Sequence, residues 1–370
     1  MNTRRATLII LILFTSRLFL MAQEVDTWHE KPELTLSGFL DIYYVYDFNL
    51  PQGTSRQPFL YNHNRHNEFN LNVGLLKLGV DHKKYRANFA LQSGTYANDN
   101  YAAEPGVLKN IFEANVGISM SRNNKLWLDA GIFSSHLGVE NPISIYNMTL
   151  TRSLSAEGSP YFLTGAKITY YPSEKLEIAG LILNGWQRIQ RVPGNSIPSF
   201  GSQILFKPSD KITLNWSTFL GTDDPDSTRR MRIFNNLYGQ LQFSEKFGMI
   251  AGFDFGRQSN IVGTAPFYYW LSPTLIAQWS LHENWKIAAR TEYYQDPDEV
   301  IISTQTANGF QTLGFSINLD YAPSPNVLCR IEGRMLNSKD NIFESPAGPR
   351  DYNYIIGASM AVRFSEQIKK

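Results

Sequence analysis

Cysteine is almost absent from this sequence. Cys329 is the only one in 370 residues, so the chain cannot form an internal disulfide. It also lacks the paired thiols that a zinc or redox site of the cysteine type requires. We therefore expect Cys329 to be an ordinary residue in the wall of a sheet.

Long apolar runs are missing after residue 22. The marked run before that point, Leu8 to Phe14, follows Arg4 and Arg5 and precedes the small residue Ala22. This order predicts a secretory signal peptide over 1–22, because the run is too short to cross about 30 Å of hydrocarbon. A chain without apolar helices that spans a membrane must do so as a closed β-barrel, in which every backbone group pairs between strands.

The chain also has no large net charge of either sign. The formal net charge is +1, and removal of the signal peptide, with three arginines and no acidic residue, changes it to −2. This balance gives no reason to expect a nucleic-acid partner. No linker rich in Pro, Gly or Ser divides the chain. We expect a periplasmic N-terminal segment at 23–33, one barrel at 34–364 and a C-terminal tail at 365–370.

Apolar and polar residues alternate with a period of two in segments of about ten to fourteen residues, which suits a tilted membrane strand better than a soluble sandwich. The aromatic content of 13% also favours strands. The segments 211–221 and 309–321 are clear examples. In two others we expect a shared apolar face, made in 66–81 by Phe69, Leu71, Val73 and Leu75, and in 110–120 by Phe112, Ala114, Val116 and Ile118.

The whole chain can be divided into about sixteen such segments, an even number as bacterial barrels require. They are expected near 34–47, 66–81, 84–97, 109–120, 124–134, 161–172, 174–186, 198–208, 210–221, 232–244, 246–257, 266–281, 284–295, 309–322, 325–336 and 351–364. The connections between them alternate between tight and long, which is typical of an up-and-down transmembrane antiparallel β-barrel with short periplasmic turns, long outer loops and both termini periplasmic. The longest connection is 135–160, and another long one is expected at 258–265.

Several stretches resemble the OmpL-like putative β-barrel porin family of Bacteroidota outer membranes. They include LSGFLDIYYVYDFNLP at 36–51, LWLDAGIFSSHLGVE at 126–140 and TLTRSLSAEGSPYFLTGAKI at 149–168. The strand at 351–364 also resembles the closing strand of outer-membrane barrels, with an aromatic end at Phe364 that the barrel-assembly machinery reads. The resemblance implies an outer-membrane location and no established catalytic or ligand residues.

This resemblance implies a porin, a passive or weakly selective channel for small hydrophilic solutes. The expected partners are outer-membrane lipid, these solutes, the barrel-assembly machinery during insertion and, in a homo-oligomer, further copies of the chain; the barrel acts as a trimer or a monomer. The alternatives are a non-conducting surface or structural barrel and, third, a hydrolase embedded in a barrel.

The loop 135–160 is the third long connection of the predicted barrel. It is the best candidate for a constriction, because the third outer loop of general porins folds inward. Its polar candidates are Glu140, Asn141, Arg152 and Glu157. Charge on the lipid face costs about 2–4 kcal/mol at the midplane, so strand parity predicts that six wall residues face the lumen: Lys286, Arg290, Glu292, Arg330, Glu332 and Arg334. Opposed charges would screen solutes through a transverse field; alternatively, these side chains only pair with one another.

Catalytic and metal-binding patterns are weak. Ser135 and His136 are adjacent, and adjacent residues of an extended strand point to opposite faces. His63 and His66 lack a clear third ligand, and the acidic run at 223–226 is typical of a solvated loop tip. We expect no enzymatic activity, no cofactor and no metal.

Overall fold

The protein is a closed barrel of sixteen antiparallel strands in the computed structural model, which describes residues 27–261 and 264–368. Each strand pairs with its neighbours in sequence, and β16 closes the ring by pairing with β1. The predicted fold is confirmed. The expected signal peptide at 1–22 lies outside the described residues. In the part of the chain that the structure describes, no helix is long and apolar enough to cross a membrane.

Every predicted strand has one counterpart, with its ends moved by a few residues. The strands are β1 (Glu33–Asp47), β2 (Phe69–Asp81), β3 (Tyr85–Ser93), β4 (Ile111–Ser119), β5 (Leu126–Ser134), β6 (Phe162–Ser173), β7 (Leu176–Leu183), β8 (Ser199–Ser209), β9 (Ile212–Gly221), β10 (Arg232–Gln242), β11 (Phe247–Ile261), β12 (Thr264–His282), β13 (Trp285–Asp296), β14 (Phe310–Ser324), β15 (Val327–Ser338) and β16 (Tyr352–Gln367). The short helices are η1 (Thr27–His29), α2 (Thr95–Asn100), η2 (Gly106–Asn110), η3 (Ser144–Tyr146) and α3 (Leu154–Glu157).

Two boundaries differ from the prediction. β16 continues past Phe364 to Gln367, because Ser365, Glu366 and Gln367 still pair with β1. Half of the expected C-terminal tail is therefore strand. The long loop expected at 258–265 is also largely strand, since β11 and β12 continue to pair as far as Ile261 and Thr264.

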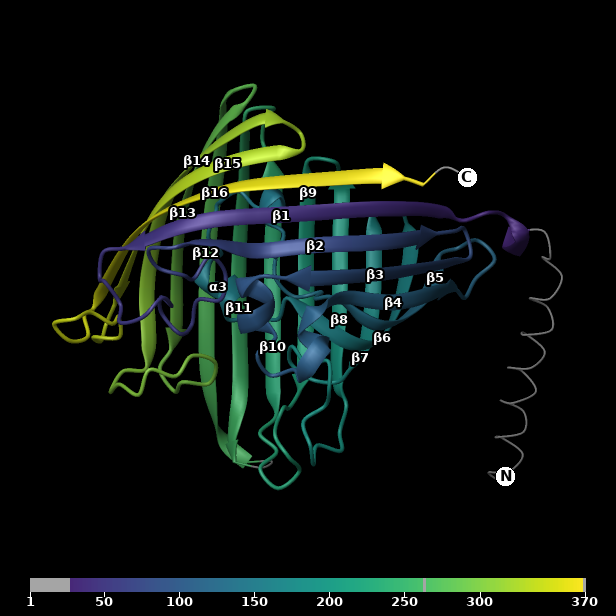
Figure 1. Cartoon of the computed structure of the whole chain (residues 1–370). Coiled ribbons are helices and arrows are strands. Elements are labelled where there is room, and N and C mark those ends of the chain that lie inside the picture. Colours follow the sequence, from purple (N-terminus) through teal and green to yellow (C-terminus); the bar gives the residue numbers. More distant parts are fainter. Residues whose placement is uncertain (1–26, 262–263, 369–370) are drawn as a thin grey trace.

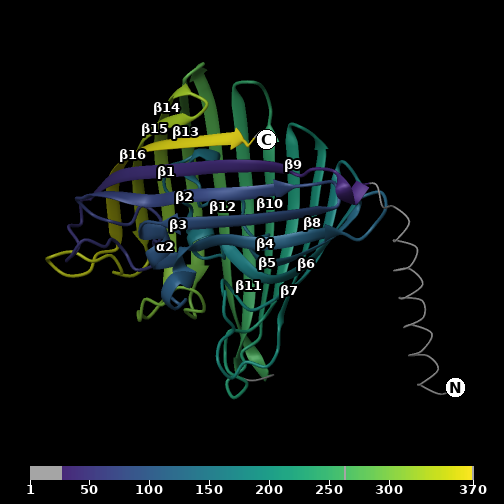
Figure 2. The ribbon, with the colours of Figure 1, turned by 45° about the vertical axis from the view of Figure 1, so that its right-hand side comes forward.

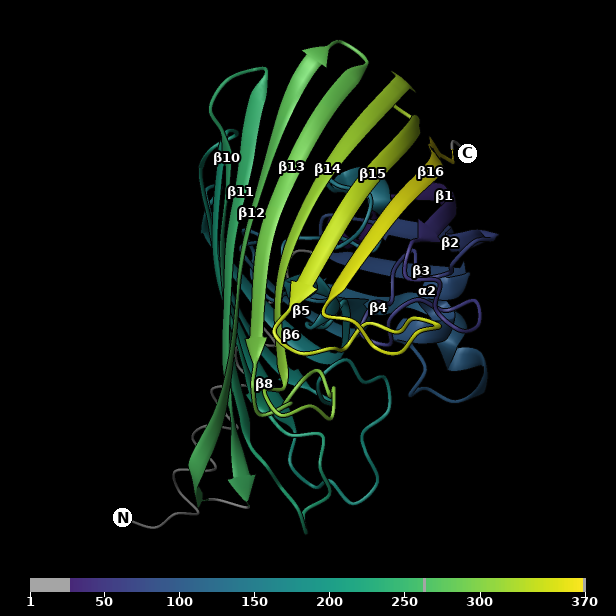
Figure 3. The same cartoon turned by 90° about the vertical axis from the view of Figure 1, so that its left-hand side faces the viewer.

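The two ends of the barrel differ. At one end, which we call the short-turn end, the strands are joined by tight turns such as 174–175 and 283–284. The other, the long-loop end, carries the connections 48–68, 94–110, 135–161, 184–198, 222–231, 297–309 and 339–351. Figure 1 shows β1 to β5 crossing in front of the steeper strands β9 to β13, so that opposite walls cross at a large angle, as the tilt of barrel strands requires. Figure 2 shows the same wall after a turn of the molecule. In Figure 3 the strands β11 and β12 extend further down than β13 and β14.

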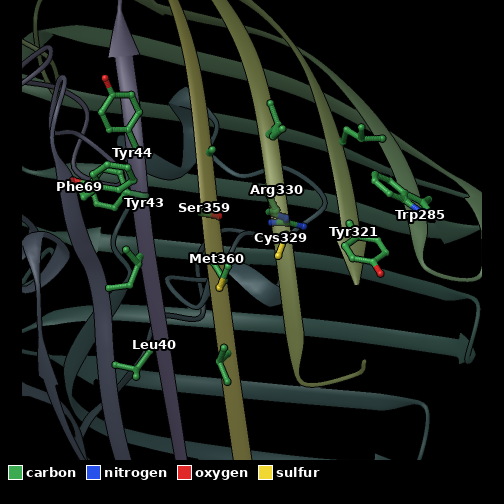
Figure 4. A pocket seen from close by; sticks show the side chains of 15 residues that line it. Leu40, Tyr43, Tyr44, Phe69, Trp285, Tyr321, Cys329, Arg330, Ser359 and Met360 are labelled. Atoms are coloured by element: carbon green, nitrogen blue, oxygen red, sulfur yellow. The ribbon is translucent and has the colours of Figure 1, made fainter. Parts of the chain in front are cut away.

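The outer face of the barrel is apolar, and its inner face is mixed. On β14 the side chains of Phe315 and Ile317 are exposed, whereas those of Ser316 and Asn318 are buried inside. Figure 4 shows part of the outer face on β13 to β16 and β1, a hollow lined by apolar side chains such as Met360 and by Cys329. Cys329 is therefore the wall residue that the sequence predicted, and its thiol is free.

A β-bulge at Asn72 corrects the expected face of β2. Asp41 and Ile42 of β1 pair with Val73 and Leu71, which leaves Asn72 as an extra residue. Because side chains alternate strictly along a strand, one extra residue moves all later ones to the other face. Val73 is fully buried inside the barrel, whereas Phe69 on the other side of the bulge is 82% exposed.

Phe112 is displaced in the same way. Ala90 and Leu91 of β3 pair with Glu113 and Ile111, so Phe112 is the extra residue of β4. It is buried in an interior cluster, whereas Val116 is exposed on the outer face. The expectation that these two residues share a face was wrong.

Candidate functional site: the loop-filled lumen

The loop 135–160 lies inside the barrel and binds one wall through its first residues. The imidazole Nε2 of His136 lies 2.9 Å from the carbonyl oxygen of Thr218 on β9. The backbone carbonyl of His136 accepts a hydrogen bond from Ser217 Oγ at 2.7 Å. One step further along, the backbone N–H of Gly138 donates to Asn236 Oδ1 on β10. These bonds fix the start of the loop on β9 and β10.

The second half of the same loop binds the wall at β13 to β15, which lies about halfway around the ring from β5 and β6, where the loop begins and ends. The backbone N–H of Leu150 donates to Asn318 Oδ1 on β14 at 3.1 Å, and that of Thr151 donates to Glu332 Oε2 on β15 at 2.6 Å. The N–H of Leu154, at the start of α3, donates to Glu292 Oε2 on β13 at 2.6 Å. The loop therefore crosses the lumen from β5 and β6 to β13, β14 and β15 and contacts β9 and β10 between them. Figure 1 shows α3 within the ring of strands.

Five charged side chains form the surface to which the loop binds. They alternate along β13 and β15, face inward and are at most 4% exposed: Arg290, Glu292, Arg330, Glu332 and Arg334. Glu292 lies 2.7 Å from Arg334 Nη2, and Glu332 lies 3.0 Å from Arg290 Nη2. These five residues therefore lie on the inner face, as strand parity predicted. Their charged groups form ion pairs with one another and hydrogen bonds with the loop. Lys286, the sixth wall candidate, is exposed.

Arg330 organises the turn of the loop around η3. Its guanidinium donates to the carbonyl oxygens of Ser144 and Thr149 at 2.9 Å and to that of Asn147. Its remaining N–H groups bind both carboxylate oxygens of Asp320 at 2.9 Å. A guanidinium presents its N–H groups in a fixed fork, so this one side chain holds three loop carbonyls in place.

Two of the four loop candidates, Arg152 and Glu140, form hydrogen bonds within the loop itself. Arg152 is fully buried and donates to the carbonyl oxygens of Asn141, Leu150 and Pro142. Glu140 accepts from the hydroxyl of Ser153 and, at 2.9 Å, from its backbone N–H. Asn141 lines a cavity at the short-turn end.

Glu157 joins this loop to a second loop, 48–68, which sequence reasoning did not place inside the barrel. Its carboxylate accepts from the backbone N–H groups of Tyr61 and Asn62 at 3.0 and 3.2 Å. Burial raises the pKa of Glu157 to about 7, although these hydrogen bonds and Arg152 act in the opposite direction. The contact between the two loops therefore depends on a carboxyl group that titrates near neutral pH.

The loop 48–68 is also fixed to the wall of β1. His63 Nε2 lies 2.9 Å from Asp41 Oδ2, and both side chains are fully buried. Arg56 lies 3.6 Å from Asp47 at the end of the same strand. Burial lowers the pKa of His63, which keeps the imidazole neutral. The sequence of this second inward loop contains a run of Asn, His and Arg at 62–67, whose side chains can form hydrogen bonds and ion pairs with the inner wall.

An apolar cluster fills the lumen at the long-loop end. Trp186 packs against Phe219 and Phe234 with ring centroids 5.0 Å apart, and Phe59 of the loop 48–68 packs on Phe310 at 4.8 Å. The narrow space between the loop 135–160 and the wall at β10 to β12 has a volume of only about 10 Å³, barely enough for one water molecule. The loop 135–160 is thus tightly packed against this part of the wall.

Larger cavities remain at the short-turn end. One of about 490 Å³ is lined by residues of β1, β2, β4 and β16, including Lys77, Glu113 and Arg363. The other, of about 320 Å³, is lined by residues of β12 to β15, including Lys286. Both are bounded by the loop 135–160 through Tyr146. Together they form a vestibule below the loop.

The weaker chemical candidates have other partners. Ser135 Oγ accepts from the N–H of Leu137, and His136 binds the wall, so the two side chains are not arranged as nucleophile and base. His66 accepts from the N–H of Asp47, away from His63. Asp224 and Asp226 form ion pairs with Arg230 and Arg229. Among the described residues, no three His, Cys, Asp or Glu side chains converge as a metal site.

Comparison with known proteins agrees with this geometry. A family model described as "Putative beta-barrel porin-2, OmpL-like" matches residues 33–364. The chain belongs to this family. Family and fold together point to the outer membrane and to a diffusion channel. No curated protein matches the chain.

Solved structures share the fold of this family member at low sequence identity. The anion-selective porin from Comamonas acidovorans has a TM-score of 0.61 at 9% identity, covering 90% of this chain and 100% of that one. The outer-membrane channel DcaP of Acinetobacter baumannii has a TM-score of 0.59 at 9% identity, covering 90% and 98%. The Salmonella typhi OmpF complex with daunomycin has a TM-score of 0.58 at 10% identity, covering 90% and 97%. At this identity the likeness concerns the fold alone.

Proposed function

We propose that the protein is an outer-membrane porin whose lumen is narrowed by two loops, so that only small hydrophilic solutes diffuse through it. The observation that carries the proposal is the loop 135–160, which starts from the wall at β5 and β6 and binds the opposite wall at β13 and β15 through Leu154 and Thr151. A peptide segment fixed at both walls restricts the lumen at its own level. In this proposal Glu140, Asn141, Arg152 and Glu157 belong to the constriction, and the charges of β13 and β15 hold it.

The long-loop end faces the outside of the cell in this proposal, and both termini are periplasmic. This follows the general rule that barrels of this kind carry short periplasmic turns and long outer loops. Exposed apolar residues such as Trp216, Ile317 and Met360 contact outer-membrane lipid, and the barrel-assembly machinery inserts the chain. OmpT of Vibrio cholerae, a structural neighbour at 6% identity, is described in a trimer form; native mass spectrometry distinguishes a trimer from a monomer here.

Two other functions make different predictions. A non-conducting surface or structural barrel carries no current in a planar bilayer. A barrel hydrolase needs a nucleophile beside a base at the outer rim, whereas Ser135 and His136 are bound to other partners. We propose on this basis that the protein has no catalytic role.

Liposome swelling tests the size limit. Vesicles that contain the purified barrel should swell quickly in a pentose and slowly in a trisaccharide, whereas a wide, unobstructed barrel would admit both. The variant Thr151→Ala removes a hydroxyl that binds Glu332 at 2.8 Å and should speed the entry of the larger sugar. Thr213→Ala, at the short-turn end of β9, is the matched control. Equal rates for both sugars in the wild type would contradict the proposal.

A further inference from the structure

In the vestibule at the short-turn end, basic side chains without a carboxylate partner among the described residues outnumber acidic side chains without a basic partner. Its two cavities, of about 490 and 320 Å³, meet at Tyr146 and Arg363. The charged side chains that line them are Lys77, Glu113, Glu283, Lys286, Asp320, Arg330 and Arg363. Because a paired charge presents little net field to a solute, the free charges decide what the vestibule attracts.

The inward-facing acids of the vestibule are neutralised by bases. Glu113 lies 2.6 Å from Lys77 Nζ, and Asp320 is bound by both arms of the Arg330 guanidinium. The other N–H groups of Arg330 donate hydrogen bonds to carbonyl oxygens of the loop 135–160. The one acid left is Glu283, which lies on the turn between β12 and β13 at the rim.

Two bases of the vestibule have no carboxylate partner among the described residues. Lys286 is exposed on β13 and lines the cavity of about 320 Å³. Arg363 binds only the carbonyl oxygen of Pro325 at 3.2 Å, and its guanidinium carbon lies 5.5 Å from the ring centre of Tyr146. Tyr146 is 60% exposed, so the arginine and the ring both border open space.

Further inside the lumen both signs occur: Asp254 is bound by Asn236 and by no base among the described residues, and Lys167 is a base without an acid. Lys167 faces inward on β6 over the ring of Phe133, at 5.7 Å from its centre. Its cross-strand partner Asp129 is bound by two nitrogens of Arg86, each at 2.6 Å. Lys167 is therefore a further inward ammonium group with no acid bonded to it in the described structure.

We infer that the vestibule is an anion-selecting site, and that the solutes that pass best are small molecules carrying a carboxylate or phosphate group. Lys286 and Arg363 provide its charge, and Arg363 beside Tyr146 provides hydrogen-bond donors for an oxyanion. In water, a unit charge about 7 Å away raises the local concentration of a monovalent anion about threefold and lowers that of a cation by the same factor, before screening. This inference rests on the proposed function.

Reversal potentials in a planar bilayer test the inference. In a potassium chloride gradient around 0.1 M, the wild type should prefer chloride over potassium about threefold or more, and the preference should fall towards one near 1 M salt. The double variant Lys286→Gln and Arg363→Gln should lose most of this preference. The matched control, Lys211→Gln and Lys246→Gln, makes the same charge change on exposed turns outside the lumen and should keep the wild-type ratio.

The outcomes separate the two proposals. A wild-type barrel that conducts but prefers potassium, or a double variant with an unchanged ratio, overturns the inference and leaves the porin proposal intact. A folded barrel that carries no current overturns both, with folding checked by the gel shift between unheated and heated samples. Inorganic phosphate in the bath provides a second readout: it should reduce the chloride current of the wild type more than that of the double variant.

Discussion

Glu157 makes the contact between the two lumen loops sensitive to pH. The carboxylate is 6% exposed and holds the backbone of Tyr61 and Asn62. If the loop 48–68 moves away, this group enters water and regains its ordinary pKa of 4.5, whereas in the closed arrangement its pKa is raised to about 7 by burial. An acid with a raised pKa disfavours the closed arrangement as pH rises from 4.5 to about 7.

The size of the effect follows from the difference in pKa. A shift from 4.5 to about 7 corresponds to roughly 3 kcal/mol, or about 300-fold in the ratio of open to closed channels. His63 of the loop 48–68 gives the opposite pH dependence, because it disfavours the closed arrangement as pH falls. Its pKa is lowered by burial, so protonation below its ordinary value of 6.5 also favours release of the loop. Between about pH 4.5 and 6.5 the two effects oppose each other, so the open probability of the wild type should be lowest in this range and rise on either side of it, and the full change due to Glu157 should appear only when His63 is replaced.

Single-channel recordings from pH 4 to pH 8 can measure this response. Glu157→Gln should abolish the rise towards neutral and alkaline pH and keep the rise at acidic pH. His63→Gln should do the reverse, because an amide can still donate to Asp41 without titrating. Glu344→Gln, at an exposed acid of another long loop, is the control. The reasoning fails if Glu157→Gln retains the alkaline rise, or if the wild type closes as pH increases.

Other expectations concern topology, folding and selectivity. An epitope inserted near Asp224 or Asp340 should be accessible to antibodies on intact cells, and one at Ser209 or Pro323 should not; the reverse result would invert the proposed orientation. The purified chain should give a β-rich circular dichroism spectrum and a heat-dependent gel shift, and a helical spectrum would contradict the fold. Replacing both Glu140 and Glu157 by Gln should lower cation permeability relative to anion permeability. Because both acids are buried, we expect a smaller change than for Lys286 and Arg363, and an unchanged reversal potential would place the loop outside the field.

The strands were predictable because their signal is local. Alternation with a period of two can be read in each segment without knowing what it pairs with. The bulges at Asn72 and Phe112 were not predictable in this way, since an extra residue is recognised only against the partner strand. A regular alternation such as Phe69, Leu71, Val73 can therefore be correct on one side of a bulge and inverted on the other.

The charged residues of β13 and β15 show the same limit at the candidate site. Parity and the cost of charge in lipid were enough to place Arg290, Glu332 and their neighbours inside. Their partners were not predictable, because Thr151 and Glu332 are 181 residues apart in sequence and meet only when the barrel closes. The same holds for Glu157 and Tyr61, which are 96 apart.

The contact at Glu157 and the free charges of the vestibule lie at different levels of the lumen, so their effects on opening and on selectivity should be separable. The contact at Glu157 lies among the loops near the apolar cluster of Phe59 and Phe310, whereas Lys286 and Arg363 lie in the vestibule below the loop 135–160. At physiological salt, charges interact weakly beyond a screening length of about 8 Å. Glu157→Gln should therefore change the pH dependence of opening much more than the reversal potential. The double variant Lys286→Gln and Arg363→Gln should change the reversal potential and leave the pH dependence of opening intact. If either variant altered both properties equally, one structural element would have to control both, and the assignment of separate roles to loops and vestibule would fail.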